Sequence, residues 1–314
     1  MKRSSALPLL LLVAWVAGTV LGAEGGPGAS AATAVEVTRA HAEFTPVLPG
    51  DRTVFLLLVG SDARPGADML HSLADSIHLV ALDPGRARAT IVGIPRDTWV
   101  EIPGHPMNKV NAALVEGGPP LLVETVENLL HVRIAYVAVT SFWGLPAIVD
   151  QVGGLTINVP CATNDSYTRS SFDPGRQPMG GAHVLDFARD RHSYAASDLA
   201  RSENGGRVLI GALTEFRRQL SDDPGALLIW LAAGLGNVET DVPIPELALL
   251  AYTAAQIRPQ NVQNVVLPGT PGIEFSRDVI HLSADALSLA RDLVRKGVVS
   301  PKHLPPSPTK DCRP

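Results

Sequence analysis

Short apolar runs, each bounded by glycine, proline or polar residues, alternate along the chain with stretches of helical periodicity. The runs predict buried β-strands at residues 53–60, 76–84, 89–95, 135–140, 155–160 and 261–268. Apolar residues at helical spacing predict helices at residues 120–130, 142–154 and 284–296, and helical patterns dominate between residues 181 and 257. This alternation predicts an α/β fold, with a central mixed or largely parallel sheet flanked by helices on both faces.

The amino-terminal segment has a different pattern. Lys2 and Arg3 precede an uncharged apolar stretch at residues 6–23, which at ~1.5 Å per residue would span roughly 27 Å, close to the thickness of the bilayer hydrocarbon core. It predicts a transmembrane signal anchor or a signal peptide, with residues 1–5 in the cytoplasm and the remainder outside. The further prediction is a linker, a folded body and a disordered Pro-rich tail, at residues 24–50, 51–298 and 299–314.

Composition narrows the class of protein. The chain has 314 residues, of which 46% are hydrophobic and 18% charged, so it can bury a sizeable core. Its formal net charge of -5 argues against bulk binding of nucleic acid, so any anion site must be local. Cys161 and Cys312 would lie in an oxidising compartment, and the sequence leaves open whether they form a disulfide or stay as two thiols.

Charged residues gather where the predicted strands begin and end. Asp62 and Arg64 follow the first strand, Asp75 stands at the entry to the second, and Arg96 and Asp97 follow the third. In α/β folds, ligands meet the loops at strand ends. Such residues form either a lattice of ion pairs or a metal-assisted anion site, because arginine grips phosphate oxygens two at a time and paired carboxylates hold Mg²⁺.

A second arginine group lies between residues 187 and 207. Asp198 and Arg201 are three residues apart and therefore share one face of a predicted helix. Gly205 and Gly206 lie inside that helix, where each costs roughly 1 kcal/mol relative to alanine. They allow either a close approach of a ligand to the backbone or a kink, and the sequence leaves both open.

These motifs together resemble the LytR-CpsA-Psr proteins, bacterial cell-wall glycopolymer ligases, and the composition hints at an actinobacterial source. The matching stretches are LLLVGSDAR, LADSIHLVALDP, IVGIPRDTWVEIPG, NKVNAAL, VDQVGGLTINVP, ARDRH, DLARSENGGRVL and VVLPGTPG. The resemblance covers about residues 52–297. It implies a sandwich of helices around a central sheet, with an apolar cavity for a polyprenyl chain.

The resemblance also implies roles for individual residues. Asp62 and Asp75 would hold Mg²⁺ against the diphosphate of a polyprenyl-linked donor, and the implied catalytic residues are Asp75, Arg96 and Asp198. Of the candidate general bases, Asp198 ranks before Asp97. The implied diphosphate ligands are Arg64, Arg96, Arg189, Arg191, Arg201 and Arg207. Family members commonly carry arginines at two positions where this chain has Leu73 and Val100.

The implied reaction is the transfer of a glycopolymer from a polyprenyl-diphosphate carrier to a peptidoglycan hydroxyl. It implies an enzyme at the cell membrane with an extracytoplasmic catalytic domain, or a secreted one if the signal is cleaved, with no nucleic-acid partner. Two alternatives remain open. One is a polyprenyl-diphosphate hydrolase that uses water as the acceptor. The other is a non-catalytic lipid-binding or regulatory protein, which Leu73 and Val100 make plausible.

Overall fold

A six-stranded mixed sheet lies at the centre of the computed structural model, which describes residues 53–313, in the strand order β10-β3-β2-β1-β6-β9. β1 runs parallel to β6 and β10 parallel to β3, and the other neighbours are antiparallel. The predicted α/β class with a mixed sheet is confirmed. The strands are β1 (Val54–Ser61), β2 (Ala74–Asp83), β3 (Arg88–Gly93), β6 (Ile134–Ser141), β9 (Val238–Thr240) and β10 (Val262–Val266).

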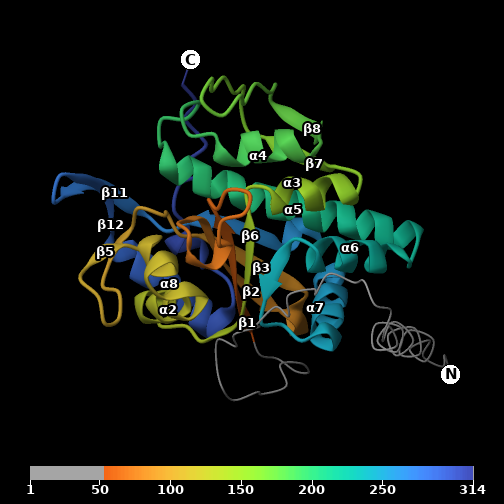
Figure 1. Ribbon diagram of the computed structural model, residues 1–314, viewed down its shortest axis with the longest axis horizontal. Coiled ribbons are helices and arrows are strands. Elements are labelled where there is room, and N and C mark those ends of the chain that lie inside the picture. Colours follow the sequence, from red (N-terminus) through yellow and green to blue (C-terminus); the bar gives the residue numbers. More distant parts are fainter. Residues whose placement is uncertain (1–52, 314) are drawn as a thin grey trace.

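Helices cover both faces of this sheet (Figure 1). On one face lie α2 (Ala112–Leu130) and α8 (Ala284–Lys296). On the other lie α5 (Asp198–Asp222), α6 (Ala226–Leu235) and α7 (Ile244–Gln256). The predicted helical region between residues 181 and 257 therefore consists of separate helices, with the short edge strand β9 between α6 and α7.

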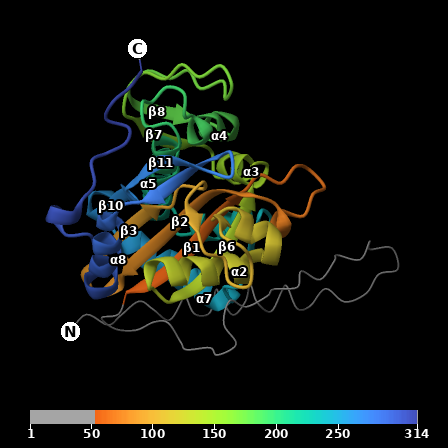
Figure 2. The ribbon, with the colours of Figure 1, turned by 90° about the vertical axis from the view of Figure 1, so that its left-hand side faces the viewer.

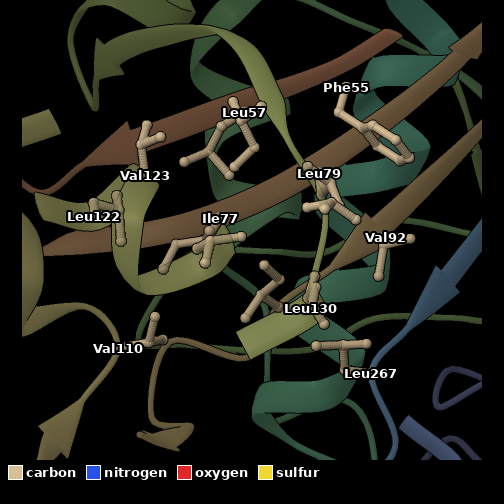
Figure 3. Close-up of a cluster of buried hydrophobic side chains, with 14 of the residues drawn as sticks. Phe55, Leu57, Ile77, Leu79, Val92, Val110, Leu122, Val123, Leu130 and Leu267 are labelled. Atoms are coloured by element: carbon tan, nitrogen blue, oxygen red, sulfur yellow. The ribbon is translucent and has the colours of Figure 1, made fainter. Parts of the chain in front are cut away.

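Alternation along β1 explains the two layers. Phe55, Leu57 and Val59 are buried in the main core, which includes residues of α2 and α8. Figure 3 shows Leu57 of β1 in this core, together with Leu122 and Val123 of α2. Successive strand residues point to opposite faces, so the intervening leucines of β1 lie on the other face. There they line apolar cavities beneath α5, α6 and α7.

A smaller layer is built on α5. It contains α3 (Gly144–Gln151), α4 (Gly181–Arg189) and the hairpin of β7 (Leu155–Val159) and β8 (Gly175–Met179). It has its own hydrophobic core, to which Ile157, Phe187 and Val208 contribute. The strand predicted at residues 155–160 is thus present but lies outside the central sheet. Figure 2 shows β7, β8 and α4 gathered at one end of the molecule.

Short elements complete the described chain. Two small antiparallel pairs lie outside the central sheet: β4 (Trp99–Val100) with β5 (Asn108–Lys109), and β11 (Gly269–Glu274) with β12 (Arg277–Leu282). The 3₁₀ turns are η1 (Met69–His71), η2 (Pro84–Arg86), η3 (Pro259–Asn261) and η4 (Pro301–His303).

The carboxy-terminal tail is ordered, and the prediction that it is disordered was wrong. Cys312 forms a disulfide with Cys161, which decides the choice that the sequence left open. Thr309 is buried, and its backbone N–H donates to Glu203 Oε2 of α5 at 3.0 Å. A covalent bond and a buried carboxylate thus outweigh the disorder-favouring composition of the tail.

The predicted anchor and linker, residues 6–23 and 24–50, lie outside the described residues. Between residues 53 and 313, no helix has both the length and the apolar character needed to cross a membrane.

Gly205 and Gly206 allow α5 to lie very close to the sheet. A methyl group at Gly205 would clash with the ring of His78 on β2, and one at Gly206 would clash with the amide of Asn264 on β10. Asn264 Nδ2 donates to the Glu203 carbonyl at 3.0 Å and so fixes this approach. α5 runs through both glycines without a break. Close helix–sheet packing therefore explains the pair, and the kink is excluded.

Candidate functional site

Three central strands bring charged residues to one edge of the sheet. β1, β2 and β3 are successive antiparallel neighbours, so the end of β1, the start of β2 and the end of β3 coincide. Arg96 Nη1 lies 2.5 Å from Asp75 Oδ1, and Arg96 Nε lies 3.5 Å from Asp97 Oδ2. Lys109 of β5 approaches Asp97 at 2.8 Å. The strand-end residues Asp75, Arg96 and Asp97 therefore meet as predicted.

Arg96 is held by charge rather than by full hydrogen bonding. Burial alone would lower the pKa of its guanidinium, but Asp75 and then Asp97 raise the pKa above its usual value. Its Nε atom is buried and has no hydrogen-bond partner among the described residues. The nearest acceptor, Asp97 Oδ2 at 3.5 Å, lies at the limit of hydrogen-bond distance, so Nε keeps the capacity to donate to a closer acceptor.

The second half of the site comes from the end of α4 and the start of α5. Arg201 Nη2 lies 3.0 Å from Asp198 Oδ1, and Arg191 Nη1 lies 3.8 Å from Asp198 Oδ2. Asp198 stands in the first turn of α5, where the helix dipole favours a carboxylate. The guanidinium of Arg189 lies 4.8 Å from the centre of the Phe142 ring, which holds it by a cation–π contact.

The two halves enclose one cavity of about 330 Å³, here called the arginine cavity. It is lined by Asp75, Arg96, Tyr167, Thr168, Arg189, Arg191, His192 and Arg201. Burial lowers the pKa of Arg201, whose side chain is only 12% exposed. An anion in the cavity would compensate this desolvated cation.

Two apolar cavities continue from the arginine cavity. The first, of about 270 Å³, shares Asp75, Arg189 and Arg201 with it and is otherwise mostly apolar. The second, of about 360 Å³, lies between the sheet and α5–α7. Both apolar cavities are lined by Leu58, Ala138, Leu209 and Val238. The site therefore suits a ligand with an anionic head and a long apolar tail.

Three of the predicted site residues lie elsewhere. Asp62 accepts a hydrogen bond from the backbone N–H of Leu73 at 2.9 Å and does not line the arginine cavity. Arg64 is exposed to solvent outside it. Arg207 Nη2 lies 3.4 Å from Glu203 Oε1 and 2.9 Å from Thr309 Oγ1, so it faces the tail. The structure does not bring Arg64 or Arg207 to the cavity.

The two positions at which family members commonly carry arginine have different surroundings in this protein. Leu73 is exposed and bonds with Asp62 through its backbone, whereas Val100 is buried in the main core. No regular pattern in the sequence pointed to Tyr167 and Thr168, because they lie in an irregular loop between β7 and β8. His192 lies next to Arg191 in the sequence, and this proximity to the arginine group is the signal that pointed to it.

The carboxylates of this site could hold Mg²⁺ only if the substrate supplied some of the metal ligands. Within residues 53–313, no group of three or more His, Cys, Asp or Glu side chains could hold a metal ion. Mg²⁺ typically takes one or two protein carboxylates and fills its octahedron with phosphate oxygens and water. Asp75 presents such a carboxylate at the cavity, and Asp62 follows the neighbouring strand. The cavity itself therefore offers one carboxylate to the cation, and phosphate oxygens and water would have to supply most of the other ligands.

Comparisons with known proteins agree with this architecture. The chain is 31% identical over 223 residues to the polyisoprenyl-teichoic acid–peptidoglycan teichoic acid transferase TagU of Oceanobacillus iheyensis, which covers 69% of this chain and 67% of that protein. It is 28% identical to TagV of Bacillus subtilis, covering 71% and 58%. It is 35% identical to the probable cell wall biosynthesis protein LcpB of Corynebacterium glutamicum, covering 46% and 37%.

Solved structures share the fold. The crystal structure of B. subtilis TagV superposes with a TM-score of 0.66 at 24% identity, over 81% of this chain and 100% of that chain. TagT bound to LI-WTA gives a TM-score of 0.66 at 20% identity, over 82% and 95%. The model of the LytR_cpsA_psr family matches residues 28–293. The chain therefore belongs to the LytR_cpsA_psr family, as its motifs predicted.

Proposed function

We propose that the protein transfers a glycopolymer from a polyprenyl-diphosphate carrier to a hydroxyl group of peptidoglycan. One observation carries the proposal: the arginine cavity opens through Asp75, Arg189 and Arg201 into an apolar cavity. A lipid diphosphate is complementary to this arrangement, because it has an anionic head and a hydrocarbon tail. Relatives named as teichoic acid transferases, among them TagU and TagV, support the same class of reaction.

The arginines would act on the charge of the reacting diphosphate. As the acceptor oxygen attacks the phosphorus nearest the sugar, negative charge grows on the departing lipid phosphate. Arg96, Arg189 and Arg201 can each offer parallel N–H donors to phosphate oxygens. Donors that are already in place stabilise this charge without a cost of reorganisation during the reaction. The energy for transfer is stored in the diphosphate bond.

Magnesium is part of the proposal. Asp75, together with Asp62 after the paired strand β1, would hold the cation, which supplies neutralisation of phosphate charge when bound. Around that position, the protein itself binds and orients the diphosphate through its arginines.

A membrane-bound location outside the cytoplasm is also part of the proposal. It is supported by the apolar stretch at residues 6–23 and by a donor whose tail resides in a bilayer. The Cys161–Cys312 disulfide adds support, because structural disulfides persist mainly in oxidising compartments.

Removal of Mg²⁺ tests the proposed reaction. Protein supplied with a polyprenyl-diphosphate glycopolymer and peptidoglycan oligomers should form a covalent product, detected by mass spectrometry, and excess EDTA should reduce its formation by about 100-fold or more. Restoring Mg²⁺ should restore the rate. Release of the glycopolymer phosphate into water without attachment would instead identify a hydrolase. Saturable donor binding without turnover would identify a lipid-binding protein.

Leu209 tests the role of the apolar cavities, because it lines both of them. Leu209→Trp should fill the space between them and raise KM for a long-chain donor by about 10-fold, through the loss of a few buried methylene groups. A short-chain donor that ends before this point should be affected little. Leu228→Trp is the matched control, because Leu228 is exposed on α6 and lines neither cavity. Equal KM changes for both donors would contradict the assignment.

A further inference from the structure

An aspartate–histidine pair lies at the wall of the arginine cavity. Asp165 belongs to the loop between β7 and β8, and His192 follows α4. Asp165 Oδ2 lies 2.8 Å from His192 Nδ1, and the aspartate side chain is fully buried. Its Oδ1 accepts the backbone N–H of Tyr167 at 2.9 Å. Both carboxylate oxygens are therefore engaged.

Asp165 is ionised throughout the neutral range. Burial alone would raise the pKa of its carboxyl group, but hydrogen bonds from the His192 ring and from the backbone N–H groups of Tyr167 and His192 lower it to about 2. Because this folded-state pKa lies below the usual value of 3.8, the pair stabilises the fold above that value. The contribution is lost only as the pH falls towards about 2.

The geometry fixes which nitrogen of His192 is available. An ionised carboxylate only accepts hydrogen bonds, so Nδ1 carries the proton and Nε2 carries the lone pair of the neutral ring. Within the part of the chain that the structure describes, no group bonds to Nε2. The His192 side chain is 35% exposed and lines the arginine cavity. Tyr167 covers the ring, with the ring centres 4.7 Å apart.

The carboxylates considered from sequence are less suited to accept a proton. Asp198 lies between Arg191 and Arg201, and Asp97 lies between Arg96 and Lys109. A carboxylate among fixed cations is a weak base, because the cations stabilise its ionised form. Asp97 also does not line the arginine cavity. A neutral imidazole aligned by a buried carboxylate is the usual arrangement of a general base.

We propose that His192, oriented by Asp165, is the general base that activates the acceptor hydroxyl, an inference that rests on the proposed transfer reaction. The hydroxyl proton passes to Nε2 while the hydroxyl oxygen forms a bond to the phosphorus nearest the sugar. The bond from that phosphorus to the bridging oxygen breaks, and its electron pair leaves on the lipid phosphate. The proton then passes from Nε2 to the departing phosphate or to water, which returns the ring to its neutral form.

The charged and titratable groups that face His192 come from each surrounding element. They are Asp165 and Tyr167 of the β7–β8 loop, neighbouring Arg191, and the cavity residues Asp75, Arg96, Arg189 and Arg201. These groups set the electrostatic environment in which Nε2 would accept the proton of the hydroxyl.

The test compares His192→Gln with the wild type in full-length protein. We expect the rate of donor cleavage to fall by about 100-fold or more, and the Kd for the donor to stay within about 3-fold because the arginines remain. Added imidazole should partly restore the rate of His192→Ala. His303→Gln is the matched control. His303 also pairs with a carboxylate, since its Nδ1 lies 2.7 Å from Asp292, but it does not line the arginine cavity.

The outcomes separate this inference from the proposed function. If the wild type attaches glycopolymer to peptidoglycan and His192→Gln does so equally well, the base assignment fails and the transferase stands. If the wild type only hydrolyses the donor and His192→Gln loses that activity, the transferase fails and the base stands, with water as the acceptor. Three results would each overturn the assignment of His192 as the general base. They are equal losses in His192→Gln and His303→Gln, a failure of imidazole to rescue His192→Ala, and a wild type that cleaves no donor.

Discussion

Replacement of Arg201 by alanine should reduce the transfer rate by about 10³-fold or more, comparable to the loss of an arginine that stabilises phosphoryl charge in other enzymes. Arg201 lines both the arginine cavity and the first apolar cavity, so it lies where the phosphate head of the proposed donor would meet its lipid tail. Its desolvated guanidinium gains more from an anion than an exposed one would. Single-turnover kinetics with a saturating donor would measure the loss in the chemical step.

Two variants make the Arg201 result specific. Arg64→Ala should leave the rate within about 2-fold, because Arg64 is exposed and lies outside the cavity, and distant surface substitutions rarely matter. Arg201→Lys should recover only part of the rate, since lysine keeps the charge but loses the planar fork. If Arg64→Ala were as damaging as Arg201→Ala, the diphosphate would have to bind elsewhere on this edge of the sheet.

Loss of the disulfide should have the largest effect on stability. Cys161 and Cys312 are separated by 151 residues, and a cross-link of such a long loop typically contributes about 2–5 kcal/mol by restricting the unfolded chain. The double variant Cys161→Ser with Cys312→Ser should therefore lower the free energy of unfolding by about 2–5 kcal/mol. Urea denaturation followed by tryptophan fluorescence would give this difference.

The disulfide also holds the loop that carries Arg191 and His192. The backbone N–H of Arg313 donates to the Ser193 carbonyl at 2.9 Å, and the backbone N–H of Ala195 donates to the Asp311 carbonyl at 3.0 Å. Reduction of the wild type should reproduce the destabilisation of the double serine variant, whereas reductant should not affect that variant further. Unchanged urea midpoints after reduction would show that Glu203 and the packed tail suffice without the covalent bond.

The central part of the fold and half of the site could be predicted because their signals are local. Each apolar run marks a buried strand, and a charged residue directly after a strand must lie at an edge of the sheet. Asp75 and Arg96 therefore meet as expected. Arg189, Arg191 and Arg201 were found by their clustering, although the contact between the two halves is a tertiary feature that only the structure shows.

The remaining features depend on contacts between distant segments. Asp165 lies in a loop with no periodicity, 27 residues before its partner His192. Arg207 was expected among the diphosphate ligands from the family resemblance, but its six-residue separation from Arg201 on α5 turns it towards the tail. The composition of the tail predicted disorder. No sequence pattern indicates that Thr309 bonds with Glu203 or that Cys312 pairs with Cys161.

The alternating side chains of the central strands have a consequence for the stability of the protein without its lipid. Leu56, Leu58 and Val80 line the larger apolar cavity, so this face of the sheet is packed against α7 in part and borders open space in part. Each Å² of apolar surface left uncovered forgoes about 25 cal/mol. A polyprenyl tail in this space would act as an exchangeable layer of hydrophobic core. Binding of the donor would then bury apolar surface of the protein, as folding does, and release of the lipid would expose that surface again in every catalytic cycle.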